Sequence, residues 1–524
     1  MTLRPRRRPL VRAGLTAVCL AALWVTTGQG QAPGSGRVRI QERTLPAMDA
    51  GLRAQDPPRD PGGPRPYAAR LDGAAAQPRL YLGDSVIVKF RDTADGTAVL
   101  SAMDAARATG RTRLPYADFD IVRLAAGEDP EAAAEALRAR DDVEYAQPRY
   151  LNHKMLRPND QYFDRQWNLT DLGMERAWDI QPGATSDIVV AVLDTGVAYT
   201  SDMIRYESAF PFQLEEEGEV FPALGEVDVP FAAAPDLGDA SRFVSPHDFI
   251  WDDDLPPFDL DGHGTHVTGT IGQATNNTIG VAGMAFNVRI MPVKVLDGVW
   301  DFIFGSPYQA TDDVLARGIR YAADNGADII NMSLGRELGG PATAIESAIE
   351  YAVGRGVFVA IASGNDQLTG NRANRVAEAA PRIAGMMAVG AVNRNLALAY
   401  YSTTGSYVEI AAPGGDIRTR GENGILQQTL DFDLLETYVD GPTHFGPPRA
   451  DAFGYYYFQG TSMATPHVSG FAALLKQQGI TSPAAIEAAM TQFATDKGTA
   501  GKDNAYGYGL IAPRDTLRGL GLAR

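Results

Sequence analysis

Between residues 187 and 392 the chain alternates between short apolar runs and segments with apolar residues at helical spacing. The run at 187–194 is almost continuously apolar and is bounded by turn residues, which is typical of a strand buried on both faces of a sheet. Repeated strand–helix–strand units of this length predict an α/β fold with a doubly wound, mostly parallel sheet flanked by helices. The pattern predicts further strands at 288–296, 328–332, 357–362 and 387–392, and helices at 174–178, 312–323 and 344–353.

A smaller module precedes this region. Asp129 and Pro130 fit the N-cap and the first-turn position of a helix, because proline at that position loses an N–H group that would have no partner. The apolar pattern around them predicts strands at 86–90, 119–124 and 143–146 and another helix at 97–106. Residues 79–150 are therefore expected to form a small α+β domain.

The first thirty residues have the features of a secretory signal peptide. Several arginines precede an apolar run at 14–25, and small residues follow it. This run is too short to span a membrane. It contains Cys19, the only cysteine, and Val18 stands where a lipoprotein signal has a small residue. We therefore favour removal of Cys19 with the signal over a lipid anchor, and we expect a secreted or periplasmic protein with no stable membrane anchor and no disulfide.

The amino-acid composition predicts a linker between the signal peptide and the small module, and it argues against a nucleic acid partner. Residues 31–78 are rich in proline, glycine, alanine and arginine and have no sustained apolar period, so they are predicted to be a disordered linker. The chain has 524 residues, 45% of them apolar, and a formal net charge of −17. A phosphate-binding surface needs a basic patch, and none follows the N-terminal arginines, so no nucleic acid partner is expected.

Four polar residues are the candidates for chemistry. Open parallel sheets bind ligands at the carboxyl ends of their strands, and Asp194 and Asn365 follow two such ends. Ser462 precedes an apolar run at helical spacing, so it lies at a helix N-terminus, where the N–H groups favour developing negative charge. Taken alone, a serine in that position is usually only a helix cap. A catalytic serine needs a base, and the base needs a carboxylate that fixes its tautomer and stabilises its positive charge; His263 and Asp194 supply these two groups.

Three motifs carry a resemblance to a known family. Residues 193–197 (LDTGV), 263–269 (HGTHVTG) and 460–467 (GTSMATPH) resemble the signature motifs of the subtilase family of serine peptidases. Their order along the chain is one of the orders known for convergent triads.

The resemblance implies a role for each candidate. Asp194 would orient His263, which would act as general base and then as general acid, and Ser462 would attack the substrate carbonyl. Asn365 matches the family's oxyanion residue. No cofactor is implied for catalysis.

The resemblance also implies a substrate cleft and a specificity. One wall of the S1 pocket would be the segment that pairs with the substrate backbone, and the other would lie opposite, so peptides of varied sequence would fit. The residues concerned are Ser333, Leu334 and Gly335 on the first wall and Ala362, Ser363 and Gly364 on the second. A carboxylate at Asp366, next to Asn365, would favour basic P1 residues.

A structural calcium ion is implied at residues 273–281 (QATNNTIGV), which resemble a calcium loop of many subtilases. Oxygen ligands suit this cation. The family's carboxylate ligand would fall at Met203, next to Asp202. The loop ligands implied are Thr275, Asn277, Ile279 and Val281.

Other polar residues are interpreted as structural. His266 and His467 are expected to support the site, because the family uses neighbouring positions as supports. The pair His263 and His266 lacks the spacing and the glutamate of a zinc protease. The acidic residues at 252–254, 259 and 261 are interpreted as a solvated loop, with a second ion site as the alternative.

Residues 79–150, with their ending VEYAQP, resemble the inhibitor propeptide of secreted subtilases, which implies a ferredoxin-like fold. An independent small domain is the alternative. The peptidase domain would span 158–518, with a mature start between 150 and 164. Two segments, 199–246 and 418–457, are longer than a minimal family member needs, and we hypothesise that the second lines one edge of the cleft and restricts substrates.

The leading hypothesis is a secreted serine endopeptidase that acts on protein or peptide substrates through an acyl-enzyme, made as a self-processing precursor with its own propeptide as inhibitor. A catalytically silent homologue that serves as a binding protein is the runner-up, against which the intact set of candidate residues argues. A lipid- or ester-cleaving hydrolase is disfavoured, because Ser462 has no Gly-x-Ser-x-Gly elbow around it.

Overall fold

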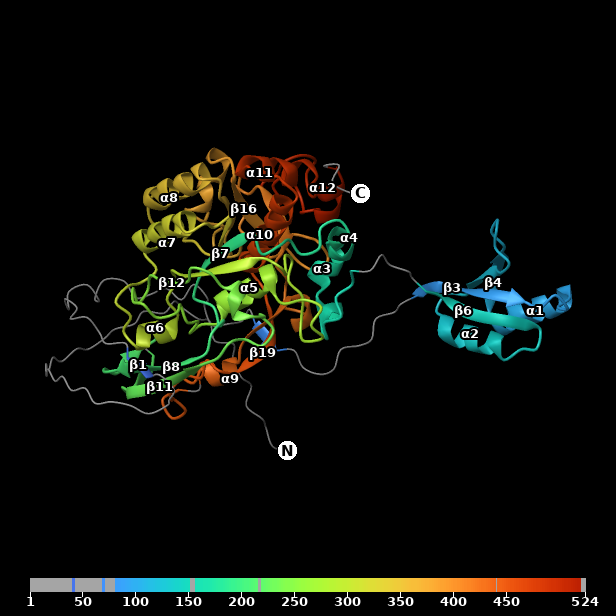
Figure 1. Ribbon diagram of the computed structural model, residues 1–524, viewed down its shortest axis with the longest axis horizontal. Helices are drawn as coiled ribbons and strands as arrows, with labels where there is room; N and C mark the ends of the chain where they lie inside the picture. Colours follow the sequence, from blue (N-terminus) through green and yellow to red (C-terminus); the bar gives the residue numbers. More distant parts are fainter. Residues whose placement is uncertain are drawn as a thin grey trace, which may run out of the picture. The chain divides into compact units, whose positions relative to one another are not determined.

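The computed structural model describes residues 40–42, 68–70, 81–150, 156–214, 218–439 and 441–519. The chain divides into two compact units (Figure 1). The main unit comprises Met1–Ala74 and Pro158–Arg524, and the module comprises Ala75–Arg157. The predicted signal peptide at 1–30, with Cys19, lies outside the described residues.

The main unit is built on a seven-stranded sheet in which every neighbouring pair of strands is parallel. This confirms the predicted α/β class. Five strands fall at the predicted positions, whereas the outermost two were not predicted. The order across the sheet is β12 (His247–Asp248), β13 (Arg289–Lys294), β7 (Val189–Asp194), β14 (Ile329–Met332), β15 (Phe358–Ala362), β16 (Met386–Val392) and β17 (Ile410–Pro413).

Helices cover both faces of this sheet. A Cβ atom at Gly318 of α7 (Asp312–Asp324) would touch Val293 and Leu193, whereas one at Gly264 of α5 (His263–Gly272) would touch Asp194. Successive residues of a strand point to opposite faces, so α5 and α7 lie on opposite sides. Helix α10 (Thr461–Gln477) packs on α5, and α8 (Thr343–Gly354) packs on α7 (Figure 1).

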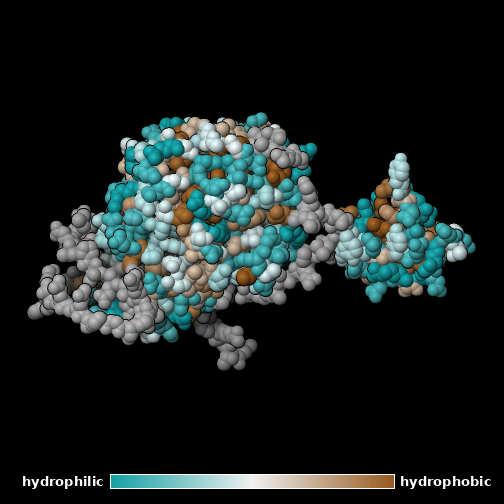
Figure 2. Space-filling view, in the orientation of Figure 1, coloured by the Kyte–Doolittle hydropathy of each residue, from teal (hydrophilic) through white to brown (hydrophobic). Residues whose placement is uncertain are grey.

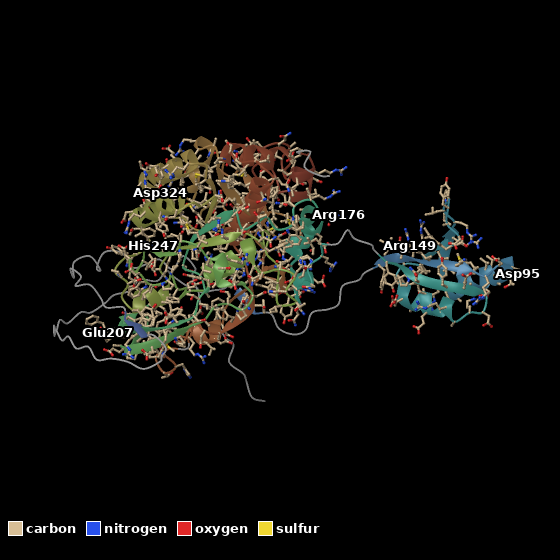
Figure 3. The ribbon with its side chains drawn as sticks, viewed as in Figure 1. Asp95, Arg149, Arg176, Glu207, His247 and Asp324 are labelled. Atoms are coloured by element: carbon tan, nitrogen blue, oxygen red, sulfur yellow. The ribbon has the colours of Figure 1, made fainter. Side chains whose placement is uncertain are left out.

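The remaining helices are short and lie around this frame. They are α3 (Trp167–Asp171), α4 (Met174–Trp178), α6 (Val299–Ile303), α9 (Phe432–Leu435), α11 (Pro483–Gln492) and α12 (Pro513–Gly519). Figure 3 labels His247 on β12 and Asp324 at the end of α7. Hydrophilic residues cover most of the face shown in Figure 2, as the net charge of −17 leads one to expect.

The module has the element order β-α-β-β-α-β of a ferredoxin-like fold, with an antiparallel sheet in the order β4-β5-β3-β6. Asp129 accepts a hydrogen bond from the Glu131 N–H as the N-cap of α2, as predicted. Strand β4 was missed because its sequence, ATGRT, has no apolar alternation. The elements are β3 (Tyr81–Phe90), α1 (Gly96–Ala105), β4 (Ala108–Thr112), β5 (Asp120–Leu124), α2 (Pro130–Arg138) and β6 (Val143–Tyr150).

The two long segments of the main unit form β-structure of their own. The first contains β8 (Asp202–Ser208), β9 (Phe212–Gln213), β10 (Val220–Phe221) and β11 (Gly225–Phe231), and the second contains β18 (Ile425–Leu430) and β19 (Phe453–Phe458). Phe445 joins them, because its ring contacts Phe212 and Phe221 and stacks on Trp300 with centroids 5.7 Å apart.

The range 31–78, predicted as a disordered linker, contributes two strands, and the prediction is wrong at these positions. Strand β1 (Ile40–Glu42) pairs parallel with β8, and β2 (Ala68–Arg70) pairs antiparallel with β19. A strand added at a sheet edge is held by backbone hydrogen bonds and needs no apolar periodicity, so composition does not reveal it.

Candidate active site

Asp194 and His263 form the closest polar pair of the candidate site. Asp194 ends β7 and is fully buried, and its Oδ1 accepts hydrogen bonds from His263 Nδ1 at 2.6 Å and from the Thr195 N–H at 2.8 Å. Helix α5 approaches β7 this closely because Gly264 has no side chain, and a Cβ atom there would collide with the Gly196 carbonyl. The ring of His263 keeps 24% of its surface exposed, so Nε2 is available to a substrate.

The carboxylate of Asp194 changes the basicity of His263. Burial by itself lowers the pKa of the imidazole, but the negative charge and the hydrogen bond of Asp194, helped by Asp261 and Asp259, outweigh it. The pKa of His263 is therefore raised above 6.5. A raised pKa means that the imidazolium, which forms when His263 takes a proton, is stabilised in place.

Asp259 fixes the start of α5. Its carboxylate is buried and accepts hydrogen bonds from Thr195 Oγ1, from the N–H groups of Asp261, Gly262 and Thr265, and from Thr265 Oγ1. The interpretation of the whole acidic run as a solvated loop is therefore wrong for Asp259. Asp252, in contrast, forms an ion pair with Arg317 at 2.9 Å on the surface.

Ser462 is the second residue of α10, as its position before an apolar run predicts. Its N–H has no intrahelical acceptor, because the first N–H groups of a helix have none. Among the described residues, its hydroxyl is not bonded to His263 but donates to the Ser333 carbonyl at 3.1 Å. In proteins without substrate, catalytic hydrogen bonds are often unformed, so a rotation about the Ser462 side chain is required before base catalysis.

Pro466 lies inside α10, and its missing N–H leaves the carbonyl four residues earlier without a helical partner. That carbonyl belongs to Ser462. Ser333 Oγ donates to it at 2.7 Å, so a side chain from the end of β14 replaces the lost helical hydrogen bond.

Asn365 lies beside Ser462 with its amide group oriented. Its Oδ1 accepts hydrogen bonds from the Thr461 N–H and from Thr461 Oγ1, both at 2.9 Å. Because the backbone N–H can only donate, the oxygen is fixed on that side and the Nδ2 group points the other way. Asn365 is exposed, so this donor and the N–H of Ser462 are available to an oxyanion.

The six residues predicted as cleft walls lie at the ends of β14 and β15, and one side chain connects the two. Asn374 Nδ2 donates to the Leu334 carbonyl at 3.0 Å and to the Ala362 carbonyl at 2.7 Å. Gly335 permits this contact, because a Cβ atom there would overlap the Asn374 amide. Ser363 is buried, with its Oγ on the Thr403 carbonyl. Sequence reasoning missed Asn374, because one asparagine in a loop carries no motif.

Asp366 does not offer a free carboxylate to the S1 pocket, so the reasoning behind a basic P1 preference is wrong. Arg372 binds both of its oxygens at 2.9 and 2.8 Å, and Thr369 adds a further hydrogen bond. The guanidinium of Arg372 holds the pKa of Asp366 well below its usual range. The carboxylate is therefore neutralised by a partner of its own.

The predicted calcium loop connects α5 to β13. Asn277 Nδ2 donates to Asp236 Oδ1 at 2.8 Å, and the Val281 N–H donates to Asp236 Oδ2 at 3.0 Å. Asp160 is bonded to the same loop, because its Oδ2 accepts a hydrogen bond from the Asn276 N–H. The other oxygen of this carboxylate, Oδ1, is buried without a hydrogen-bond partner. The position at which the resemblance places a carboxylate, Met203 next to Asp202, lies at the start of β8, and a carboxylate that is bonded to the loop comes from Asp236.

This loop has the donor chemistry of a calcium site. Burial raises the pKa of Asp236 to about 7 although hydrogen bonds from Asn277 and Val281 oppose it, and the charge of Asp160 adds to the rise, so a cation would relieve an unfavourable charge there. The other predicted loop ligands are placed by local bonds: Thr275 Oγ1 donates to the Gln273 carbonyl, and the Ile279 N–H donates to Asn277 Oδ1. Within the described ranges, no group of three or more His, Cys, Asp or Glu side chains is arranged around a metal position.

His266 and His467 are buried supports. His266 Nε2 lies 3.0 Å from the Ile425 carbonyl of β18, and burial lowers its pKa to about 3. His467 contacts the Met463 carbonyl and the Asn168 amide, and burial lowers its pKa to about 4. Both rings are therefore neutral at physiological pH.

The β18–β19 hairpin of the second long segment borders the turn that carries His263. Thr429 Oγ1 donates to the Gly262 carbonyl, and a Cβ atom at Gly262 would lie 3.2 Å from the ring of Phe432. Phe432 stacks against Phe458 with ring centroids 5.7 Å apart. The part-exposed ring of Phe432, in the segment hypothesised to line the cleft, therefore borders the turn that precedes the candidate base.

Comparison with known proteins agrees with this site. Residues 185–509 match the model of the subtilase family (peptidase S8), and residues 72–149 match the model of the fervidolysin N-terminal prodomain. The chain therefore belongs to the subtilase family of serine peptidases and carries a prodomain.

Individual relatives are similar over most of their length. The thermophilic serine proteinase of Bacillus sp. (strain AK1) is 32% identical over 405 residues, which cover 76% of this chain and 79% of that protein. Thermitase of Thermoactinomyces vulgaris is 33% identical over 327 residues, covering 62% of this chain and 86% of that protein. The solved structure of a protease from Pseudoalteromonas arctica PAMC 21717 aligns with a TM-score of 0.50 and 28% identity, covering 69% of this chain and 99% of that chain.

Proposed function

We propose that this protein is a secreted serine endopeptidase that hydrolyses peptide bonds of protein substrates through Asp194, His263 and Ser462. The observation that carries the proposal is the 2.6 Å hydrogen bond between buried Asp194 and His263, with Ser462 at the N-terminus of α10 beside the oriented amide of Asn365. Relatives named as proteases support the same reaction. Catalysis needs no cofactor.

In the proposed mechanism, His263 Nε2 takes the proton of the Ser462 hydroxyl as Oγ attacks the carbonyl carbon of the scissile bond. The imidazolium is stabilised by Asp194. The oxyanion receives hydrogen bonds from Asn365 Nδ2 and from the Ser462 N–H, and the positive end of the α10 dipole favours the same charge. His263 then protonates the leaving amine. In the second half of the reaction, His263 takes a proton from a water molecule as that water attacks the acyl-enzyme, and then returns the proton to Ser462.

Substrate would bind as an extended strand between the walls at 333–335 and 362–364. The hydrogen bonds of Asn374 to both walls hold them at a fixed separation, which favours a preformed cleft. Because extended-strand binding reads main chain, the enzyme is expected to accept varied sequences.

The module would be an inhibitor that the enzyme removes by cleaving its own chain between residues 150 and 164. Its ferredoxin-like fold and its match to a prodomain support this role. We assign residues 1–30 to a signal peptide and 158–518 to the peptidase domain. A relative from Xanthomonas campestris pv. campestris is named an extracellular protease, which supports secretion. Among the described residues, no helix is long and apolar enough to cross a membrane.

A structural calcium ion is proposed at the loop 275–281. The buried Asp160 and Asp236 and the amide of Asn277 supply oxygen donors, and the unpartnered Asp160 Oδ1 favours an added cation. The ion would neutralise the two carboxylates and stabilise the loop, and it takes no part in the reaction.

The deciding experiment compares the wild-type chain with Ser462→Ala on casein. Ser406→Ala, a change at an exposed serine, serves as the matched control. Wild type and Ser406→Ala are expected to shorten themselves and to degrade casein, and Ser462→Ala to do neither. A processed, active Ser462→Ala protein would refute the triad, and a folded wild type without activity would favour the binding-protein alternative.

A further inference from the structure

A buried ion pair lies on the strand next to Asp194. Lys294 ends β13 in register with Asp194 of β7, and its Nζ lies 2.8 Å from Asp301 Oδ2 of α6. Both side chains of the pair are fully buried. Burying two charges costs about as much as their attraction returns, so such a pair is weak evidence for stability alone. The further hydrogen bonds of both groups lead toward the candidate base.

Lys294 holds the segment that leads into α5. Its Nζ donates a second hydrogen bond, at 3.0 Å, to the Phe258 carbonyl. The next residue, Asp259, accepts the hydrogen bonds that fix the start of α5. Because these two residues are consecutive, a shift of the Phe258 carbonyl would move the Asp259 carboxylate and, with it, the turn that carries His263.

The same segment contacts the chain that follows Asp194. Gly196 has a φ of +113°, and a Cβ atom there would lie 2.6 Å from the Phe258 carbonyl oxygen. The Val197 N–H donates to the Pro257 carbonyl at 3.1 Å. The segment is therefore held by the end of β7 as well as by the buried ammonium, and both members of the candidate Asp–His pair depend on its position.

Asp301 fixes the ammonium and connects the turn to α6. Its Oδ1 accepts a hydrogen bond from Trp251 Nε1 at 2.8 Å, and its Oδ2 accepts one from the Gly298 N–H at 3.0 Å. Gly298 packs on the turn itself, because a Cβ atom there would lie 3.1 Å from the Cβ atom of Asp261. With both oxygens bonded, the carboxylate is held in one position and keeps the ammonium beside the turn.

We propose that Lys294 and Asp301 are positioning residues of the peptidase reaction: through the Phe258 carbonyl they hold the turn before α5, so that His263 stays aligned with Asp194. This inference rests on the proposed function. Neither side chain of the pair reaches the surface, so neither contacts substrate. Loss of the pair impairs the chemical step rather than substrate binding, because the predicted cleft walls come from other strands, β14 and β15.

A double variant tests the pair without leaving one buried charge alone. Removing one partner strongly destabilises a protein, because the other charge stays buried and unpaired. Lys294→Met with Asp301→Asn removes both charges and keeps side chains of similar size. We expect kcat on a chromogenic peptide to fall by about a hundredfold with KM nearly constant, since small displacements of catalytic groups have effects of that size. The rate at which a fluorophosphonate labels Ser462 is expected to fall in the same proportion.

A second ion pair of the main unit provides the matched control. Lys476 Nζ of α10 lies 2.8 Å from Asp328 Oδ1, and Asp328 Oδ2 accepts a hydrogen bond from the Val189 N–H. This pair lies at the amino ends of β7 and β14, whereas the candidate site lies at the carboxyl ends. Lys476→Met with Asp328→Asn is expected to lower the melting temperature and to keep the wild-type kcat and labelling rate.

Two outcomes of this comparison would overturn the proposal. Similar losses of kcat in the two double variants would show that any damaged ion pair of the main unit has the same effect. An unchanged kcat in the variant of Lys294 and Asp301 would show that the turn keeps its position without the pair.

A measurement on the inactive chain separates this proposal from the function on which it rests. In Ser462→Ala, the proton that His263 Nδ1 shares with Asp194 at 2.6 Å is expected to give a strongly deshielded NMR signal, which requires no activity. We expect the changes at Lys294 and Asp301 to weaken this signal or move it upfield, and the control changes to leave it as it is.

The two possible failures then differ. If the wild type has no peptidase activity while the signal changes only with the buried pair, the proposed function is wrong and the positioning role stands. If the wild type is active and all three chains give the same signal, the positioning role is wrong and the peptidase assignment stands.

Discussion

Ser333 and Ser462 exchange two hydrogen bonds: Ser333 Oγ donates to the Ser462 carbonyl at 2.7 Å, and Ser462 Oγ donates to the Ser333 carbonyl at 3.1 Å. The first bond exists because Pro466 cannot supply the helical N–H. It ties the backbone of the candidate nucleophile to the end of β14, the strand that would also bind substrate. The position of Ser462 therefore depends on a residue 129 positions away in sequence.

Removing the Ser333 hydroxyl should displace Ser462. Ser333→Ala leaves a carbonyl without its donor, which costs about 1–3 kcal/mol, and we expect a lower kcat with a smaller change in KM. Pro466→Ala in the same chain restores an N–H to that carbonyl and should recover part of the loss in thermal stability. A double variant no more stable than Ser333→Ala would show that the hydroxyl does not act through this carbonyl.

Asn365→Ala removes one oxyanion donor. Because Asn365 is exposed, we expect an unchanged melting temperature and a fall in kcat of about a hundred- to a thousandfold, with KM nearly constant. The control is Asn371→Ala, since the Asn371 amide binds Thr404. Steady-state kinetics on a chromogenic peptide measure both, and equal activities for the two variants would contradict the role of Asn365.

The activity should depend on pH through His263. Its protonated form cannot act as a base, so kcat/KM is expected to fall as the pH drops through its pKa, with a midpoint above 6.5 because Asp194 raises that pKa. Asp194→Asn removes the negative charge, so the midpoint should move to lower pH while the rate drops by about ten-thousandfold. A pH–rate profile of both proteins checks the direction, and a midpoint that rises would contradict it.

Chelation of calcium should destabilise the main unit. Saturating calcium at about a hundred times its Kd contributes about 2.7 kcal/mol to a folded state that binds it. We expect EGTA to lower the melting temperature by several degrees in wild type and to have little effect on Asp236→Asn. Asp202→Asn, next to the position that the resemblance implies, should respond like wild type. A wild-type melting temperature that does not change with EGTA would contradict a stabilising calcium ion.

The hairpin beside His263 should influence which bonds are cut. Deleting residues 431–449 would test this only coarsely, because the deletion also removes Phe445, which packs on Trp300. Phe432→Ala is expected to alter the cleavage-site profile of a peptide library, since its ring borders Gly262. Phe445→Ala is expected to lower stability and leave the profile unchanged, and the reverse pattern would contradict a role for Phe432 in specificity.

The sequence by itself determined the layered fold. Apolar runs bounded by turn residues predict buried strands such as β7 and β15, and the glycines at 354 and 356 predict the end of α8. These signals can be read from sequence because they are local and repeat every few residues. The candidate residues Asp194, His263, Asn365 and Ser462 were also available from sequence, since each sits in a short motif whose order is informative.

The tertiary structure decided what depends on contacts between distant segments. Asp236, in a segment that follows the inserted strands β8 and β11, supplies a carboxylate to the loop at 275–281 by accepting hydrogen bonds from Asn277 and Val281. Arg372 neutralises Asp366, and Asn374 connects two walls, by side-chain contacts that no periodicity encodes. Strands β1 and β2 were missed for the same reason: an edge strand takes its hydrogen bonds from a partner distant in sequence, as Ile40 pairs with Met203 and Ala68 with Phe458, and its own composition need not record the pairing.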